Sequence, residues 1–436
     1  MNDHLPGDNE PTQRVRCPVH GFIRYSKNER KVIDHWAFQR LRHVRQLAME
    51  YLVYPGGVHT RFEHSLGVLE LATQVFDHLS RGHGGHRPDI QNDLKQVPEL
   101  ADDTMPKARQ LVRLMALLHD IGHPAFAHAG EKGIPGGDHE KVSIHVIDKV
   151  LGTLLDNTFF PGAAAVLVLL MEKSPELAFL SQIVSGELDA DRADYLLRDS
   201  LHCGVSYGLF DSARLVESLT LVQDPDSGLL QLALDRGGEH TFEALILARY
   251  QMNTQVYFHK IRRIFDHYLE EYCRLWGPEN YHTLDDVLCH DDTSVTVEIR
   301  KDARRDGEKK QWASRIVERR HHRVVHETGD NADQAHLQKA KRILKRLQEH
   351  YGTMDFYLDD SPVSIHKLSI PGEQDQSKVR NLYIRERNGN SVPLAYESAI
   401  IGKIPKQVRT VRIFADADES TLKSISDEVR ELDKSI

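Results

Sequence analysis

The chain has 436 residues, of which 40% are hydrophobic and 28% are charged, a balance typical of folded globular proteins and not of disordered or fibrous ones. Its formal net charge of -9 excludes a general attraction to nucleic acid or to an anionic membrane. Any binding of phosphate groups must therefore depend on local clusters of basic residues.

Cysteine usage and hydropathy indicate a reducing compartment. The four cysteines form no CxxC pair and lie far apart, at Cys17, Cys203, Cys273 and Cys289, so neither a disulfide framework nor a cysteine-rich zinc site is predicted. The polar N-terminus lacks the apolar region of a signal peptide, and the longest apolar run, Ala163 to Met171, is too short to span a bilayer. We expect a cytoplasmic protein without membrane contacts.

The first two thirds of the chain show helical periodicity. From about residue 30 to 280, apolar residues recur three and four positions apart in segments such as KVIDHWAFQRLRHVRQLAMEYL, FEHSLGVLELATQVFDHL and KARQLVRLMALLHD. Breakers follow these segments at Pro55-Gly56-Gly57 and at Gly122 with Pro124, which are typical of helix ends. We expect a helical core over residues 1–280.

Beyond about residue 281 the pattern changes to short runs typical of strands. These runs are SVTVEIRK, NLYIRERNGNSVPLAYES with its Asn388-Gly389 turn, and VRTVRIFADA. A basic amphipathic segment from Leu337 and a final segment from about Glu419 predict two helices. The predicted fold class is mainly α: a helical core with a smaller α+β portion, residues 281–436, packed on the core and involved in oligomerisation.

The strongest local signal for chemistry is His119-Asp120, directly after the apolar helix LVRLMALL. Adjacent helical residues point about 100° apart, so both can reach one metal only if it lies over the helix end. The break at Gly122 and Pro124 provides that end. The alternative is an ordinary helix C-terminus with a solvated aspartate.

Two more segments carry candidate metal ligands. His64 lies near the start of a predicted helix, three residues after Arg61, and its alternative is a packed core histidine. Asp191 lies in GELDADRADYLLRDS, where the carboxylates repel one another unless a cation pairs with them. A metal site and a charged solvated helix are both compatible with this segment.

Two imidazoles and two carboxylates suit Mn, Fe, Co, Ni, Zn or Mg with open coordination positions. A metal bound in this way lowers the pKa of water toward about 7 and polarises a phosphoryl oxygen. Hydrolysis of a phosphate ester also needs a proton donor for the leaving oxygen. His123 and His128, followed by Glu131, are the candidates, because a carboxylate can orient a nearby imidazole.

Several motifs that follow one another in a fixed order carry a specific resemblance to a known family. The segments HTRFEHSLGV, HDIGHPAFAH, His139-Glu140 and ELDADRADYLLRD follow one another in the chain. Together they resemble the HD-domain deoxynucleoside triphosphate triphosphohydrolases, over a stretch from about Val19 to Lys260. The resemblance implies an HD-domain helical core.

The resemblance also implies roles for individual residues. The implied metal ligands are His64, His119, Asp120 and Asp191. The implied catalytic residues are His123 at the α-phosphate, His128 as proton donor, Glu131 as its acidic partner, and His139 supporting the metal-bound water. The implied triphosphate contacts are Arg61, Arg192 and Lys260, with arginine where relatives often have lysine at 192. The implied sugar contacts are Gln46, Tyr195, Asp199 and Tyr257, the last excluding a 2′-hydroxyl.

An allosteric nucleotide site is implied less completely. Asp34 and Arg42 match residues that read guanine in a relative, but Arg16-Cys17-Pro18 replaces that relative's Asn-Asp-Pro. The basic segments RIVERRHHR and KAKRILKR could bind effector phosphates, nucleic acid or a partner subunit, or could simply be solvated.

The resulting hypothesis is hydrolysis of a dNTP to deoxynucleoside and inorganic triphosphate, by attack of a metal-activated water on the α-phosphorus. The expected cofactor is a divalent transition metal (Mn, Fe, Co, Ni or Zn), with Mg on the triphosphate. The expected partners are the dNTP substrate, a nucleotide activator and other copies of the chain in a dimer or tetramer; nucleic acid is not indicated. Two alternatives are an HD phosphohydrolase for another phosphoester (nucleoside monophosphate, cyclic dinucleotide or single-stranded nucleic acid) and a catalytically weak nucleotide sensor.

Overall fold

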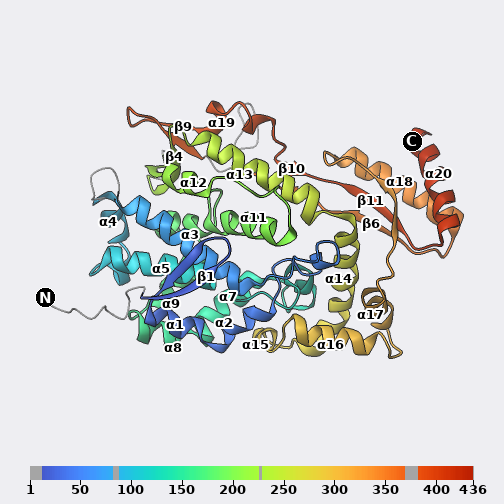
Figure 1. The fold of residues 1–436 in the computed structure, drawn as a ribbon, viewed down its shortest axis with the longest axis horizontal. Helices are drawn as coiled ribbons and strands as arrows, with labels where there is room; N and C mark the ends of the chain where they lie inside the picture. The colour runs from blue at the N-terminus through green and yellow to red at the C-terminus, as the bar shows by residue number, and fades with distance from the viewer. Residues whose placement is uncertain (1–11, 82–87, 225–227, 369–381, 436) are drawn as a thin grey trace.

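The computed structural model describes residues 12–81, 88–224, 228–368 and 382–435. A helical part carries the first two thirds of the chain, and a smaller part with three strands and two helices lies at its right-hand side in Figure 1. The long helix α14, Lys260–Asn280, lies between them. The mainly α fold class, with a smaller α+β C-terminal portion, is confirmed.

The helical part begins with an antiparallel hairpin of β1, Gln13–Cys17, and β2, Gly21–Tyr25. Its helices follow in chain order. They are α1 Lys27–Ile33, α2 Trp36–Gln39, α3 Arg61–Arg81, α4 Pro88–Leu94, α5 Thr104–Leu118, α6 Ala127–Gly130, α7 His139–His145, α8 Gly152–Thr158, α9 Ala163–Met171, α10 Ala178–Val184, α11 Ala190–Cys203, α12 Ser212–Ser218 and α13 Glu239–Met252.

Helices α3 and α5 form the centre of this part. They pack against each other, α11 packs on α3, and α9 and α10 pack on α5. All residues of α5 from Leu111 to Leu118 are buried, because neighbouring helices cover α5 on every side. This burial places the end of α5 inside the molecule.

The segment from Lys31 to Leu52 departs from the prediction of a continuous helix. It forms α1, α2 and two short 3-10 turns, η1 Arg40–His43 and η2 Glu50–Leu52. His35 caps α2, and Ala48 has a left-handed φ of 45° that no helix accommodates. The apolar periodicity is satisfied instead by burial of separate short turns.

Strands β3, Leu219–Gln223, and β4, Leu230–Asp235, lie within the segment that was predicted to be wholly helical. They pair antiparallel, and β4 also pairs parallel with β8, Tyr383–Arg385, which pairs with β9, Ser391–Pro393. The predicted Asn388-Gly389 turn joins β8 to β9, with Gly389 at a φ of 88°. The predicted boundary at residue 280 coincides with the end of α14, although this sheet contains strands from both sides of it.

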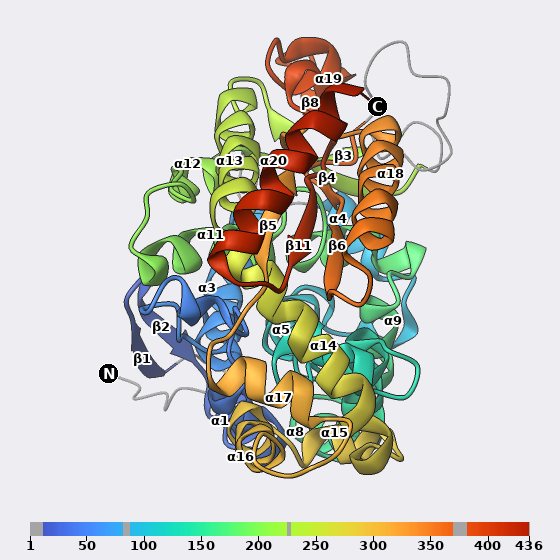
Figure 2. The ribbon, with the colours of Figure 1, turned by 90° about the vertical axis from the view of Figure 1, so that its right-hand side faces the viewer.

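The C-terminal part contains a second sheet in the order β5-β11-β6, formed by Arg323–Glu327, Val411–Ala415 and Phe356–Asp360. Helices α18, Gln334–Tyr351, and α20, Glu419–Ser435, pack on this sheet, as Figure 2 shows, and both were predicted. The remaining elements are α15 Leu284–Leu288, α16 Asp292–Asp302, α17 Lys310–Val317, β7 Val363–Ser364, α19 Leu394–Glu397 and β10 Gln407–Val408.

The strand predicted for SVTVEIRK is wrong, because this segment lies in α16. Asp291 accepts a hydrogen bond from the backbone N–H of Ser294 and so caps the helix. Val295 and Ile299, four residues apart, are buried, whereas Val297 is exposed. A strand would have put all three on one face, so tertiary packing selected the helical period.

Hydropathy gives no single membrane-spanning helix among the described residues. The helix pair α8 and α9, bent by 119° at the break between them, reaches the required length and apolarity only when its two halves are taken together.

Candidate metal centre and active site

The four predicted metal ligands converge at one place in the helical part. His64 lies in the first turn of α3, His119 at the C-terminal cap of α5 with Asp120 next to it, and Asp191 in the first turn of α11. His64 Nε2 lies 3.0 Å from Asp191 Oδ1 and 3.7 Å from Asp120 Oδ2. His119 Nε2 lies 3.7 Å from Asp191 Oδ1 and 3.6 Å from Asp120 Oδ1.

The donor atoms of this cluster fit a divalent metal. His119 Nδ1 donates to the carbonyl of Ala116 at 2.9 Å, so its Nε2 carries the lone pair. This buried atom has no hydrogen-bond partner in the part of the chain that the structure describes. Ligands that bond a metal at about 2.0–2.2 Å lie about 3.3 Å apart, close to the observed spacings. His64, His119, Asp120 and Asp191 would hold the ion, whose identity this donor set leaves open.

Electrostatics link metal binding to proton release. Burial disfavours a charged His64, but its hydrogen bonds to Asp191 and Asp194 outweigh burial and raise the pKa of His64 to about 10. Burial alone would raise the pKa of Asp191, but His119 and His64 hold it below its usual range. A cation at this position would therefore compete with the proton on His64 Nε2.

A buried carboxylate orients His64 from behind. Asp194 Oδ2 accepts from His64 Nδ1 at 2.7 Å, and Asp194 Oδ1 lies 2.6 Å from His20 Nε2. Arg198 donates to both carboxylate oxygens at 2.8 Å. This arrangement aims His64 Nε2 at the cluster, a role that the sequence prediction left unassigned for Asp194.

The four predicted catalytic residues form a second cluster. His128 Nδ1 and His139 Nδ1 lie 2.8 and 2.7 Å from the same Glu131 Oε1. The His123 ring stacks on that of His139 with centroids 3.8 Å apart, and its Nε2 lies 3.2 Å from Asp120 Oδ1. Despite burial, the two hydrogen-bonded histidines lower the pKa of Glu131 to about 2. His128 is 69% exposed and faces solvent.

The backbone between these clusters turns sharply. Phe126 and Ala127 both have left-handed φ values, 60° and 53°, which non-glycine residues adopt rarely. The buried Arg40 holds the turn by donating to the carbonyls of Ile121 at 3.0 Å and His123 at 2.7 Å. The turn returns His128 toward His123.

Three of the predicted sugar contacts, Tyr195, Asp199 and Tyr257, lie together. Tyr257 donates its hydroxyl to Asp199 Oδ2 at 2.6 Å, and the Tyr195 and Tyr257 rings lie 6.3 Å apart. The backbone N–H of Gln46 donates to the carbonyl of His59 at 3.0 Å.

His59 was missed by the sequence prediction. Its Nε2 lies 2.7 Å from Asp199 Oδ1, and its ring stacks on that of His202 at 4.4 Å. Its position two residues before Arg61 in HTRFEH was the available signal, but the partner is 140 residues away.

The predicted triphosphate cations differ in their surroundings. Arg61 pairs with Asp120 and is buried, and Arg192 lies 3.0 Å from Glu187 Oε2. Lys260 is exposed in the first turn of α14. Arg249 on α13 was missed. Its buried Nε and Nη1 atoms have no hydrogen-bond partner among the described residues. Its charge lowers the pKa of the Tyr195 hydroxyl, but the larger effect of burial raises that pKa overall.

The predicted allosteric residues occupy separate environments. Arg42 lies over the Phe62 ring at 3.5 Å and lines a cavity of about 290 Å³ together with Arg16, Cys17 and Pro18. Asp34 pairs with Arg30 at 2.9 Å on an exposed helix face and is not among the described residues that line this cavity.

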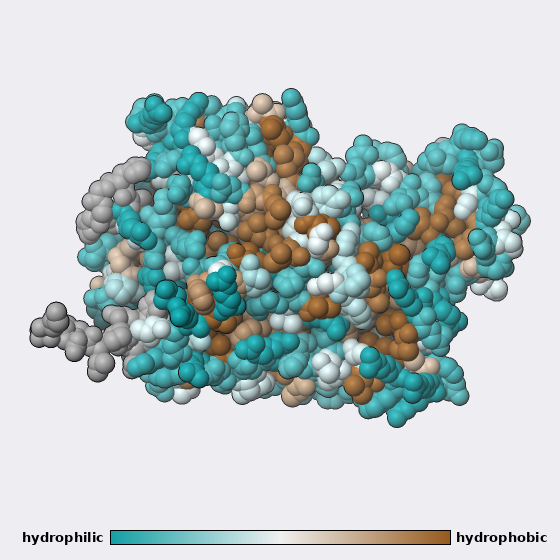
Figure 3. All heavy atoms as spheres, in the orientation of Figure 1, coloured by the Kyte–Doolittle hydropathy of each residue, from teal (hydrophilic) through white to brown (hydrophobic). Residues whose placement is uncertain are grey.

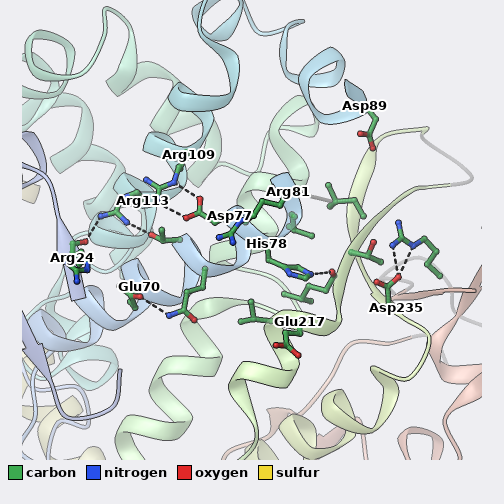
Figure 4. Close-up of a pocket in the computed structure, with 18 residues that line it drawn as sticks. Arg24, Glu70, Asp77, His78, Arg81, Asp89, Arg109, Arg113, Glu217 and Asp235 are labelled. Carbon is green, nitrogen blue, oxygen red and sulfur yellow. Dashed lines mark hydrogen bonds and ion pairs between the residues drawn. The ribbon is translucent and has the colours of Figure 1, made fainter. Parts of the chain in front are cut away.

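A larger cavity than the one beside Arg42 lies elsewhere. It has a volume of about 750 Å³, between α3, α5 and β3, and none of the described residues that line it is a predicted site residue. Figure 4 shows that its charges are largely paired: Arg109 donates to Asp77 at 2.6 and 2.9 Å. Arg385 pairs with Asp235 at 2.9 Å.

Comparison with known families accounts for the convergent histidines and aspartates. Residues 61–199 match the HD domain. This segment of the chain is similar to HD domains. Residues 210–386 match the HD associated region. The HD-domain match begins at Arg61 and ends at Asp199, so it encloses all four predicted metal ligands and all four predicted catalytic residues.

Individual relatives are similar over different lengths. An uncharacterized protein of Methanocaldococcus jannaschii is 35% identical over 58% of this chain and 47% of its own. The deoxynucleoside triphosphate triphosphohydrolase SAMHD1 homolog of Dictyostelium discoideum is 28% identical over 69% of this chain and 59% of its own. The chain thus spans about half the length of the curated relatives it matches. A crystal structure of a hypothetical protein from Aquifex aeolicus has a TM-score of 0.75 at 27% identity and covers 96% of this chain and 99% of its own.

Proposed function

We propose that this HD domain hydrolyses deoxynucleoside triphosphates to deoxynucleoside and inorganic triphosphate. The observation that carries the proposal is the adjacency of the two clusters: Asp120 belongs to the metal-ligand set and lies 3.2 Å from His123. His64, His119, Asp120 and Asp191 would hold a divalent ion, which would lower the pKa of water and polarise a phosphoryl oxygen. The exposed His128 then protonates the leaving 5′-oxygen, with Glu131 holding its other nitrogen.

In this proposal the sugar of the substrate contacts Asp199, Tyr195 and Tyr257. Asp199 has spare lone pairs for a 3′-hydroxyl beyond its bonds to His59 and Tyr257. The hydrogen bond from Tyr257 to Asp199 fixes the Tyr257 ring. In this position the ring would clash with a 2′-hydroxyl, so deoxyribose is preferred over ribose. Hydrolysis of dNTPs by the Dictyostelium relative named above supports this choice of substrate.

The triphosphate requires cations close to the metal cluster. Arg61 and Arg192 border the cluster, and Arg249 offers guanidinium nitrogens that are buried and unpaired among the described residues. Binding of phosphate oxygens would satisfy those nitrogens. We therefore expect Arg249→Ala to raise the KM for dNTP at least tenfold, and Lys260→Ala to have a smaller effect because Lys260 is exposed.

The decisive experiment incubates metal-loaded protein with each dNTP and each rNTP, singly and mixed, and separates the products by ion-exchange chromatography. Deoxynucleoside and triphosphate are expected from dNTPs, with activity abolished by His119→Ala. Turnover only in mixtures would add a nucleotide activator, for which the cavity beside Arg42 is the candidate. His145→Ala is the matched control, because His145 pairs with Asp285 at 2.8 Å outside both clusters.

Two results would contradict the proposal. Release of orthophosphate or pyrophosphate, or turnover only of another phosphoester, would assign the site to a different HD phosphohydrolase reaction. Tight dNTP binding by metal-loaded protein without any turnover would make the chain a nucleotide sensor.

We further propose that the chain assembles into a homo-oligomer. Figure 3 shows a face that is mostly hydrophilic, with apolar residues gathered over α11 and α13. Leu201, Tyr207, Leu209 and Leu247 are exposed in this region of the chain, and clustered exposed apolar residues are typical of interfaces. Light scattering coupled to gel filtration, with Leu209→Glu as the disrupting variant, measures the assembly; a monomeric wild-type protein would contradict it.

A further inference from the structure

The histidine cluster beside the predicted metal centre has the donor atoms of a metal site of its own. One nitrogen from each of His123, His128 and His139 and one oxygen of Glu131 all lie within 4.8 Å of one another. None of these residues belongs to the ligand set of His64, His119, Asp120 and Asp191. We propose that they form a second divalent-cation site, and that an ion bound there takes His128 away from proton transfer.

Two of the histidines already converge on one oxygen. His128 Nδ1 and His139 Nδ1 approach Glu131 Oε1 at 2.8 and 2.7 Å from rings whose planes are 73° apart. Two imidazoles and a carboxylate form an open three-ligand face that suits zinc and other divalent transition metals. An ion with bonds of about 2.0–2.2 Å needs ligands about 3.3 Å apart, so Glu131 must withdraw by roughly half an ångström.

His123 provides the independent observation that points to a ligand. The residue is 1% exposed, and its Nδ1 is a buried nitrogen without a hydrogen-bond partner in the described part of the chain. This atom lies 4.0 Å from Glu131 Oε1, on the side of the ring facing the cluster, while Nε2 is held 3.2 Å from Asp120. The His123 ring stacks on that of His139, and a small shift of its side chain would bring Nδ1 to the ion as a fourth ligand.

The surroundings allow an ion to enter and ligands to adjust. His128 is 69% exposed, so its side chain can move and the cluster has direct access to solvent. Glu131 lies in a single 3-10 turn, η4 Glu131–Gly133, and is not fixed within a long helix. Metal at this position would displace the protons shared between Glu131 and the two histidines.

The consequence for catalysis rests on the proposed function. A metal ion that uses His128 Nδ1 and neutralises Glu131 removes the acidic partner that orients the proton donor. Excess zinc would therefore inhibit dNTP hydrolysis, whereas the ion in the first cluster is needed for it. We expect turnover to rise as the first ion binds and to fall at least tenfold as the second binds.

The test counts metal ions and so does not depend on any activity. Chelator-stripped protein is reloaded with Co²⁺, passed through a gel-filtration column, and analysed by plasma mass spectrometry and visible absorption. Two ions per chain are expected for the wild type and for the control His145→Ala. One ion is expected for each of the single variants His119→Ala, Glu131→Gln and His139→Gln. No ion is expected when His119→Ala and His139→Gln are combined. Circular dichroism of the metal-free variants checks that each is folded. Glu131→Gln and His139→Gln both test the second site, so the test remains possible if one of them does not fold.

The outcomes separate this inference from the proposed function. A single ion in the wild type that is lost in His119→Ala would overturn the second site, whatever the activity. Two bound ions in a protein that hydrolyses no dNTP would contradict the proposed function and support the second site. Two ions with turnover unchanged by excess zinc would overturn the inhibitory role.

Discussion

At the scale of single residues, the metal-facing histidine depends on a glycine one turn away. A Cβ added at Gly67 would lie 1.9 Å from Asp194 Oδ1 and 2.3 Å from Arg198 Nη2. Only glycine therefore leaves room for the carboxylate that orients His64. The glycine in HSLGV is explained by this close approach between α3 and α11, and not by backbone conformation.

We expect Gly67→Ala to lower the free energy of unfolding by about 1–3 kcal/mol, because overpacking displaces neighbouring side chains. Displacement of Asp194 should also weaken metal binding about 10–100-fold. Urea unfolding of the metal-free protein and metal titration measure the two effects. Gly402→Ala is the control, since none of the described residues comes within 4 Å of a Cβ there. Equal behaviour of the two variants would refute the packing argument.

Glu50 predicts a pH dependence of stability. Burial raises the pKa of Glu50 from 4.5 to about 8, although Arg262 Nε lies 3.1 Å away. Between these pH values the folded protein keeps a proton that the unfolded chain releases, so stability falls as pH rises through this window. The slope is up to about 1.4 kcal/mol per pH unit.

Comparison of the wild type with Glu50→Gln isolates this contribution, since the variant lacks the titrating group. Denaturant unfolding is measured from pH 4.5 to 8, and the wild type should lose stability relative to the variant as pH rises. A difference that does not change with pH would show that Glu50 has an ordinary pKa.

At the scale of elements, the contact between α14 and η4 positions the catalytic cluster. A Cβ added at Gly277 of α14 would lie 2.3 Å from both the Cα and the carbonyl oxygen of Gly133. Gly133 ends η4, the turn that begins with Glu131. Backbone atoms cannot yield as side chains do, so the two glycines set the distance between α14 and the cluster.

We expect Gly277→Ala to reduce the free energy of unfolding by about 1–3 kcal/mol or more and to reduce Co²⁺ binding at the second site by moving Glu131. Arg274→Ala, at an exposed position on the same helix, should change stability by less than about 0.5 kcal/mol. Unfolding curves and metal counts measure both variants. A stable Gly277→Ala variant with wild-type metal content would mean that the contact is not a constraint.

In the segment that forms α16, the sequence pattern is compatible with both a strand and a helix. Val295, Val297 and Ile299 fit alternation in a strand, and Val295 with Ile299 fit one face of a helix equally well. The structure forms the helix because α16 packs on α17 and α14 packs on α17. Local residue preferences for strands were overridden by that packing.

At the scale of the whole molecule, a buried ion-pair group joins the C-terminal sheet to the helical part. Asp359 of β6 is fully buried and accepts from Arg263 Nη2 of α14 at 2.8 Å. Arg412 of β11 lies 3.5 Å from its other oxygen. Removing the carboxylate would leave two arginines without their buried partner.

We expect Asp359→Asn to lower the free energy of unfolding by about 3 kcal/mol or more and to release the C-terminal part first, which limited proteolysis would detect. The control is Asp427→Asn, an exposed partner of Arg430 on α20, with an effect within about 1 kcal/mol. Wild-type stability in Asp359→Asn would mean that the two parts are joined by apolar packing alone.

The sequence by itself determined the mainly α fold, the helix ends at His119 and Asp191, and the ordered motifs that name the candidate ligands. These features depend on periodicity, capping and breakers within a few residues, so they can be read locally. Tertiary structure alone decided that Asp194, 130 residues from His64, orients it, and that His59 contacts Asp199. It also decided that β8 joins β4 across the predicted boundary. Those contacts depend on how distant elements pack, and no local pattern encodes which buried polar group meets which.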